Sequence, residues 1–276
     1  PFPSGYALFI LQSHQSAKKS ENAMQIFNEK VATYEAAQAV VKAKYPQLRE
    51  RIIHFRDINA ENLEIAPHEI YDILLDTPEH ITRRELFAMA LDEDRERLER
   101  IFATHDEPQG GYQARRVALF GLSEIRRARV VTEYLKQGDI KGVGHLMNIS
   151  HNGDRVMLTD GSTAVYDNST PDETMHSLRN RLANGDLSAY LQFQPGGYGC
   201  STPLIDEMVD TALSIPGVMG AQLSGAGLGG CIMALVREEA TERFEKTMTE
   251  TFYQKHGLPP SVEICFPFEG SVVVTL

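Results

Sequence analysis

Apolar and polar residues follow two different rhythms along this chain. Long stretches repeat their apolar residues every three or four positions, which is the period of a helix with one buried face. Shorter runs are apolar almost throughout, which is typical of buried strands. One such run lies near the start of the chain and the others lie toward its end, whereas the helical rhythm dominates the region between them.

The helical rhythm, together with signals at the ends of each stretch, defines the predicted helices. Thr82 stands three residues before Glu85, which is the pattern of a capping box. Asp139 and Thr170-Pro171 are further start signals, and Gly138 suits a helix C-terminus. The predicted helices cover about residues 20–44, 62–75, 93–104, 112–137, 139–150, 170–184, 202–215 and 238–256.

The strand-like runs predict a sheet. They cover residues 6–11, 218–223, 231–236, 261–266 and 271–276, and Asp160-Gly161 suits the turn of a β-hairpin over residues 155–166. From residue 202 onward the order of elements is therefore α-β-β-α-β-β. This order predicts an α+β fold in which helices pack on one face of an antiparallel sheet.

Composition and charge exclude several classes of function. The chain has 276 residues, enough for one large domain or two small ones, and its net charge of -11 argues against nucleic acid as the main partner. No apolar run approaches the roughly 20 residues of a membrane helix, so no membrane partner is expected. The three cysteines are widely spaced, which indicates a reducing, cytoplasmic setting without a disulfide framework or a zinc site.

The most unusual stretch is Ser224-Gly225-Ala226-Gly227-Leu228-Gly229-Gly230, between two predicted strands. Four glycines in six residues are costly to order, because glycine loses more backbone freedom on folding than any other residue. Such a loop is expected where something approaches the backbone closely, and an anionic phosphate is the usual candidate. The alternative is a tight hairpin whose glycines serve packing.

The loop also satisfies the G-x-G-x-x-G pattern of dinucleotide-binding proteins, but in the wrong setting. That pattern requires a helix directly after the last glycine, so that the helix N-terminus meets the pyrophosphate. Here the apolar run 231–236 follows, and it predicts a strand. We therefore reject the dinucleotide interpretation. The Walker pattern G-x-x-x-x-G-K-[ST] does not occur in the chain.

The segment from Leu223 to Val236 resembles the third, C-terminal motif of the GHMP small-molecule kinases, nearest the galactokinase and N-acetylgalactosamine kinase branch. Other segments resemble this family in the same order. Phe27-Asn28-Glu29-Lys30-Val31 is similar to its Tyr-Asn-x-Arg helix, and Leu146-Met147-Asn148-Ile149-Ser150-His151 to its Leu-Met…Ser-His segment. Cys200-Ser201-Thr202-Pro203-Leu204-Ile205-Asp206 is similar to the helix before the third motif. The resemblance spans nearly the whole chain.

The family's first two motifs and its catalytic aspartate do not occur in this sequence. In the family they lie upstream of a strand like 6–11, and the chain starts with Pro1 rather than Met. We therefore expect residues 1–276 to be the C-terminal portion of a longer kinase, with the catalytic residues upstream of Pro1. Residues 1–19 would lie near the domain junction and 155–194 would be an insertion. Residues 200–276 would form the core, which the resemblance implies is ferredoxin-like.

The resemblance implies an ATP-dependent sugar kinase that transfers the γ-phosphoryl group of ATP to a monosaccharide hydroxyl, the anomeric one. ATP and Mg²⁺ would be bound mainly by the N-terminal half of the same protein, and no residue of this chain is predicted to ligate a metal. Ser224–Gly230 would approach the nucleotide from this side. Ser13, His14, Ser16 and Phe27 are weaker candidates for sugar contacts. Phe27 stands where galactokinases have a tyrosine, so galactose is not implied.

Two other interpretations stay open. The same scaffold could serve a galactokinase-like regulatory protein that binds sugar and ATP without catalysis. The upstream half distinguishes the two, because an enzyme needs the catalytic aspartate and an intact phosphate loop. The third possibility is a folded module without activity, and for this chain alone we expect no activity.

Overall fold

A computed structural model describes residues 2–15, 21–157 and 167–265 of the chain. Contacts divide the chain into two compact units. The first, here called the sheet unit, comprises Pro1–Ser16, Ala128–Tyr166 and Cys200–Leu276. The second, the helical unit, comprises Ala17–Arg127 and Asp167–Gly199. The predicted hairpin turn at Asp160-Gly161 and the predicted strand over residues 271–276 lie outside the described residues.

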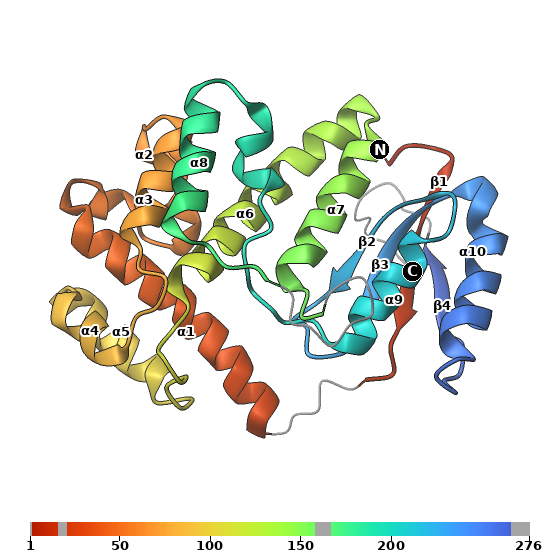
Figure 1. Ribbon diagram of the computed structural model, residues 1–276, viewed down its shortest axis with the longest axis horizontal. Helices are drawn as coiled ribbons and strands as arrows, with labels where there is room; N and C mark the ends of the chain where they lie inside the picture. Colours follow the sequence, from red (N-terminus) through yellow and green to blue (C-terminus); the bar gives the residue numbers. More distant parts are fainter. Residues whose placement is uncertain (1, 16–20, 158–166, 266–276) are drawn as a thin grey trace, which may run out of the picture. The chain divides into compact units, whose positions relative to one another are not determined.

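The sheet unit is built on four antiparallel strands in the order β2-β3-β1-β4 (Figure 1). These are β1 (Tyr6–Gln12), β2 (Val218–Ser224), β3 (Cys231–Arg237) and β4 (Val262–Cys265). β2 and β3 form a hairpin in which Ser224 pairs with Cys231, so the glycine-rich stretch is the hairpin loop. β1 comes from the other end of the chain and fills the place between β3 and β4.

One face of the sheet carries the main apolar core of this unit. Two helices cover it, α9 (Pro203–Leu213) and α10 (Thr241–Met248), and α10 continues into a π-helical turn (Thr249–Tyr253). Phe9 of β1 packs against Phe244 of α10 with ring centroids 4.7 Å apart. The predicted α+β fold, with helices packed on an antiparallel sheet, is therefore confirmed.

The alternate residues of the strands, including Leu8 and Leu235, point to the other face and pack against α7 (Ile140–Asp154). The second half of α6 (Ala114–Gln137) contributes to the same cluster. α7 approaches β2 very closely, because Gly144 faces Gly220 and a side chain at either position would overlap the backbone of the other element. The sequence predicted this helix but not its position on the sheet.

The helical unit consists of helices packed around two apolar clusters. Its helices are α1 (Glu21–Lys44), α2 (Ala60–Leu63), α3 (Ile70–Asp76), α4 (Arg83–Met89), α5 (Asp92–Phe102), α8 (Asp172–Ala183) and the first half of α6. Arg115 of α6 is buried and donates hydrogen bonds to the carbonyl oxygens of Thr77 and Thr170 at 2.8 and 3.0 Å. This guanidinium joins three segments of the unit.

Most of the local end signals act as predicted. The Thr82 hydroxyl accepts from the N–H of Glu85, whose carboxylate accepts from the N–H of Thr82. Asp139 caps α7 as predicted, and the structure shows that Thr202 caps α9. The cap predicted at Thr170 is wrong, because α8 begins at Asp172 after Pro171 and makes no side-chain cap.

Two predicted helices are less regular than expected. In the predicted helix over 62–75, Pro67 suits a break or a first-turn residue, and it does begin a short 3₁₀ turn, Pro67–Glu69, between α2 and α3. The helix over 238–256 contains the 3₁₀ turn Glu238–Ala240 before α10 and the π-helical turn after it. In both places the backbone pattern changes where the period of the apolar residues alone predicts one continuous helix.

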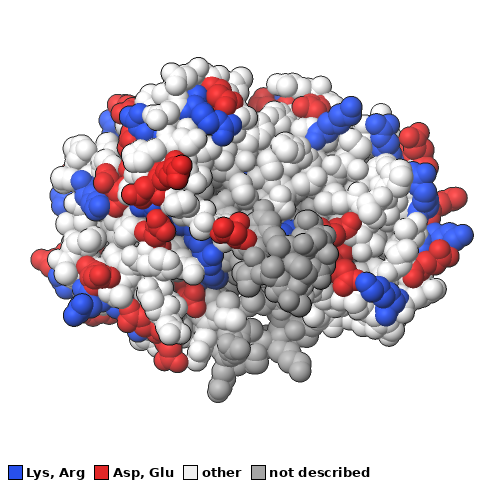
Figure 2. Space-filling model, in the orientation of Figure 1, with Lys and Arg blue, Asp and Glu red and all other residues white. Residues whose placement is uncertain are grey.

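On the face shown in Figure 2, the described Lys and Arg side chains are interspersed with Asp and Glu. Many charged side chains among the described residues form ion pairs, such as Arg126 with Glu61 and Arg51 with Glu64. Within the described ranges, no helix is both long enough and apolar enough to cross a membrane.

Candidate functional site

The loop between β2 and β3 has an unusual backbone. Its four glycines all have positive φ angles: 91° at Gly225, 82° at Gly227, 128° at Gly229 and 89° at Gly230. Leu228 also has a positive φ, 60°, which costs a residue with a side chain about 1–3 kcal/mol. A chain of ordinary residues could not adopt this path without strain, which explains the glycine content.

The middle of the loop is held by the segment that precedes α9. The backbone N–H of Leu228 donates a 2.6 Å hydrogen bond to the carbonyl oxygen of Cys200. Gly227 lies against the same peptide, and a Cβ atom at position 227 would overlap the Cys200 carbonyl oxygen. Glycine at position 227 is therefore required by packing inside the sheet unit, whatever binds to the loop.

The tip of the loop is different. Gly225 and Ala226 are exposed, and a Cβ atom at position 225 would meet nothing within 4 Å. Gly230 likewise has open space where a Cβ would be. At these positions no described residue fills the space beside the backbone, so a bound group could approach it.

The segment after β1 supports the far end of the loop. Both the hydroxyl and the N–H of Ser13 donate to the carbonyl oxygen of Gly230, at 2.7 and 2.9 Å, and the N–H of Gly230 donates to the carbonyl of Gln15 at 2.8 Å. The Thr202 hydroxyl donates to the side-chain oxygen of Gln15 at 2.6 Å. Ser13 is fully buried, so its hydroxyl holds the loop.

The other predicted sugar contacts lie in different surroundings. His14 is exposed, has a φ of 56°, and its Nε2 lies 2.9 Å from the carbonyl oxygen of Pro259. Phe27 is 43% exposed on α1, in the helical unit. Ser16 lies outside the described residues. The structure thus brings Ser13, but not Phe27, together with the glycine loop within one unit.

A buried polar pair lies beside the end of β2, where the chain enters the glycine loop. The Leu223 N–H donates to Nδ1 of His151 at 3.4 Å, and Nε2 of His151 lies 3.3 Å from Oδ1 of Asp206. Both side chains are almost fully buried. In the sequence no acid or nucleophile pattern accompanies His151, which favours a packing or capping role. One signal could have identified this pair from the sequence. His151 and Asp206 are polar residues that stand next to the apolar faces of α7 and α9, respectively.

The Asp206 carboxylate accepts several hydrogen bonds from the surrounding protein. Its Oδ2 accepts 2.9 Å hydrogen bonds from the N–H groups of both Val156 and Met157. Burial by itself raises the pKa of a carboxyl group, but hydrogen bonds from His151, Ser201 and these two amides outweigh it and hold the pKa of Asp206 below its usual value. Asp206 is therefore ionised in the folded protein at neutral pH.

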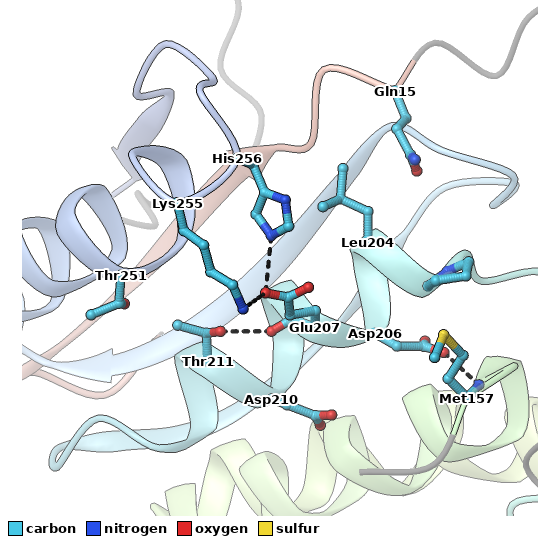
Figure 3. A pocket seen from close by; sticks show the side chains of 11 residues that line it. Gln15, Met157, Leu204, Asp206, Glu207, Asp210, Thr211, Thr251, Lys255 and His256 are labelled. Carbon is cyan, nitrogen blue, oxygen red and sulfur yellow. Dashed lines mark hydrogen bonds and ion pairs between the residues drawn. The ribbon is translucent and has the colours of Figure 1, made fainter. Parts of the chain in front are cut away.

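A cavity of about 590 Å³ lies beside α9 in the sheet unit (Figure 3). Its charged groups are already paired. Oε1 of Glu207 accepts from Lys255 at 2.7 Å and lies 2.9 Å from Nε2 of His256. Asp210 accepts two hydrogen bonds from Arg155 at 2.9 and 2.6 Å. Because these partners satisfy one another, the cavity offers a ligand little unpaired charge.

No group of three or more His, Cys, Asp or Glu side chains in the described part of the chain is placed to hold a metal ion. The residues around the glycine loop are backbone amides, small side chains and the buried His151–Asp206 pair. They can donate hydrogen bonds to an anion through the exposed backbone.

Comparison with known families identifies the region that contains this loop. The profile described as GHMP kinases C terminal matches residues 173–254. The chain contains a GHMP kinase C-terminal domain. The matched region runs from α8 through α9, the β2–β3 hairpin and α10. β1 and α7 lie outside it, although they complete the sheet and its second face.

The chain is homologous to galactokinases. It is 24% identical over 270 residues to the galactokinase of Roseiflexus sp. (strain RS-1), covering 98% of this chain and 47% of that protein. It is 29% identical over 142 residues to the galactokinase of Lactococcus lactis subsp. cremoris, covering 48% of this chain and 36% of that protein. The chain therefore spans less than half the length of these relatives.

A solved structure shares the fold. The crystal structure of Lactococcus lactis galactokinase complexed with galactose superposes with a TM-score of 0.50 at 19% sequence identity. The similarity covers 94% of this chain and 45% of the galactokinase chain. At this identity the match supports the fold and does not carry the bound sugar over to this chain.

Proposed function

We propose that this chain is the C-terminal part of an ATP-dependent sugar kinase that transfers the γ-phosphoryl group of ATP to a monosaccharide hydroxyl, the anomeric one. The observation that carries the proposal is the glycine loop, whose exposed tip leaves the backbone of Gly225 and Ala226 open inside a GHMP kinase C-terminal domain. The homology to galactokinases supports the same reaction class.

The loop would act by backbone contacts alone. Phosphoryl transfer depends mainly on alignment and on stabilising negative charge, and backbone N–H groups supply both without a proton-transfer step. Two N–H groups of the loop, those of Leu228 and Gly230, are used to hold it in place. Those of Gly225 and Ala226 make no hydrogen bond to another described residue, so they are the donors that the loop would offer to a phosphate.

ATP with bound Mg²⁺ would supply the phosphoryl group and neutralise its charge. Since the described residues provide no cluster of metal ligands, the loop of this chain would contact the nucleotide rather than the ion. The N-terminal half of the same protein would provide the phosphate loop, most of the metal contacts and the catalytic aspartate. In that arrangement residues 1–19 lie near the domain junction, 155–194 are an insertion, and 200–276 form the core.

Phe27 in the helical unit and the segment after β1 in the sheet unit are separate candidates for sugar contacts. Phe27 is exposed and could pack on an apolar face of a sugar, whereas it cannot donate the hydrogen bond of a tyrosine hydroxyl. Of the polar candidates, His14 has an exposed ring, while the hydroxyl of Ser13 is committed to Gly230. We therefore place His14 ahead of Ser13 as a sugar contact and leave the identity of the sugar to experiment.

The test is an assay of ADP formation by the intact protein with galactose, N-acetylgalactosamine, galacturonate, arabinose and fucose. We expect one of these sugars to stimulate ADP formation, and we expect this chain alone to show none. Sugar and ATP binding without turnover would instead favour the non-catalytic regulatory protein. No binding of either ligand would contradict both.

The loop itself is tested at Ala226, the one residue among 225–230 without a positive φ. Ala226→Phe adds bulk at the exposed tip without backbone strain, and Ala226→Ser is the matched control. If the tip approaches the phosphates, the phenylalanine variant loses at least tenfold in kcat/KM for ATP and keeps its melting temperature. Equal activity of the two variants would show that the tip does not meet the nucleotide.

A further inference from the structure

The His151–Asp206 pair is a buried polar cluster that reaches the glycine loop and that the proposed reaction does not use. His151 lies in α7 and Asp206 in α9, and the side chains meet beneath the end of β2. The Leu223 N–H that binds His151 belongs to the residue directly before Ser224, where the loop begins. The pair thus contacts the strand end from which the loop projects.

The hydrogen bonds determine how the imidazole is protonated. Nδ1 faces the Leu223 N–H, so it must be the acceptor and carry no proton. The neutral ring then carries its proton on Nε2, which faces the Asp206 carboxylate and has no other hydrogen-bond partner among the described residues. Asp206 is in turn held by the Val156 and Met157 amides. In this series the Val156 and Met157 amides orient the Asp206 carboxylate, and the carboxylate orients the His151 ring. The ring in turn orients the Leu223 amide.

We propose that His151 and Asp206 are positioning residues for the glycine loop: Asp206 selects the tautomer of His151, and His151 holds the Leu223 amide, so that Ser224–Gly230 leaves the strand in the direction needed to meet the nucleotide. This inference rests on the proposed function. Both side chains are almost fully buried, so we infer that the pair acts through the loop rather than by touching a ligand.

The structure offers a matched comparison one helical turn earlier. Oδ1 of Asn148, also in α7, accepts a 3.0 Å hydrogen bond from the N–H of Ala221, two residues before Leu223 on the same strand. Asn148 thus makes the same kind of helix-to-strand contact, farther from the loop. A variant at Asn148 therefore measures how stability and activity change when the α7–β2 packing is weakened. The hydrogen bond between Leu223 and His151 stays in place in that variant.

Two substitutions separate the two roles of His151. His151→Asn keeps an acceptor near the place of Nδ1 and can still hold the Leu223 amide. His151→Gln keeps a donor near the place of Nε2 but loses that acceptor. In the intact protein we expect the Gln variant to lose about ten- to a hundredfold in kcat with little change in KM for the sugar, since a loop shift near 1 Å costs that much. We expect the Asn variant to retain kcat within about threefold.

Asn148→Leu is the control, and each variant is assayed below its own melting temperature. We expect Asn148→Leu to melt earlier than the wild type while keeping its kcat. The inference is wrong if Asn148→Leu loses as much kcat as His151→Gln, or if His151→Gln keeps the wild-type kcat. Either result would mean that the His151–Asp206 pair contributes to packing only and does not position the loop.

Amide hydrogen exchange makes the test independent of activity. In His151→Gln the amides of Leu223 and of the loop tip, Gly225 and Ala226, should exchange faster than in His151→Asn or Asn148→Leu. If the wild-type protein phosphorylates no sugar, the proposed function fails, yet this exchange pattern still decides whether the pair positions the loop. Unchanged exchange at Leu223 in His151→Gln would overturn the inference in either case.

Discussion

The backbone N–H of Leu228 and the carbonyl oxygen of Cys200 are joined by a 2.6 Å hydrogen bond across the base of the glycine loop. This bond fixes Leu228 in a left-handed conformation and brings Gly227 against the peptide before α9. It divides the loop into a base that is built into the sheet unit and a tip that is exposed. Glycine is therefore required in this loop for two separate reasons, packing at the base and the backbone conformation at the tip. Substitutions can distinguish the two.

Gly227→Ala should destabilise the sheet unit more than Gly225→Ala. At position 227 the added methyl group overlaps the Cys200 carbonyl oxygen and the backbone is left-handed, so we expect a loss of about 2–4 kcal/mol. At position 225 the space is open and only the backbone strain remains, about 1–2 kcal/mol. Urea unfolding of both variants measures the difference. Equal losses would show that the Cys200 contact does not constrain the loop.

Gly144→Ala should weaken the packing of α7 on β2. The new methyl group would overlap the carbonyl oxygen of Met219, and the strand and helix would have to separate. We expect a loss of about 1–3 kcal/mol, larger than the gain from alanine's helix propensity. Gly138→Ala is the control. Its φ is 71° and no described atom lies within 4 Å of the added methyl group, so this variant loses stability through backbone strain alone. A Gly144→Ala variant as stable as the wild type would contradict this packing.

Asp206 should make stability depend on pH in the acid range. Its hydrogen bonds lower its pKa in the folded state below the value of about 3.9 in the unfolded chain. Its contribution to stability is therefore complete above pH 4 and is lost as the pH falls through the folded pKa. The difference in unfolding free energy between the wild type and Asp206→Asn should shrink from pH 6 to pH 3.

The control for that experiment is Glu99→Gln, which removes a charge from the exposed face of α5. Its unfolding free energy should stay within about 0.5 kcal/mol of the wild type at both pH values. If the gap between the wild type and Asp206→Asn is the same at pH 6 and pH 3, the carboxylate does not titrate as the hydrogen bonds indicate.

Ser13 and His14 should respond differently to substitution. Ser13→Ala removes the 2.7 Å hydrogen bond to the Gly230 carbonyl and should cost about 1 kcal/mol of stability, without raising KM for the sugar. His14→Asn keeps a residue that tolerates a left-handed backbone and loses only the exposed contact with the Pro259 carbonyl, so it should cost less than about 1 kcal/mol of stability. If His14 contacts the sugar, only this variant raises KM. A rise in KM for Ser13→Ala alone would reverse the assignment.

The sequence by itself determined the local structure and the type of loop. The apolar runs of β2 and β3, the caps at Thr82, Asp139 and Thr202, and the glycines between the strands are all local signals, because each depends on residues a few positions apart. The order of helices and strands was enough to predict an antiparallel α+β fold. It was also enough to reject a dinucleotide site, since a strand rather than a helix follows Gly230.

Only the tertiary structure decided what each of these residues does. Ser13 meets Gly230 across 217 positions of sequence, and Leu223 meets His151 across 72, so no local pattern could pair them. The four loop glycines look alike in the sequence, but the Cys200 carbonyl makes Gly227 a packing residue, whereas no described residue packs against Gly225. The physical reason is that packing and hydrogen bonding act through space, and the folded chain alone determines which backbone atoms are neighbours.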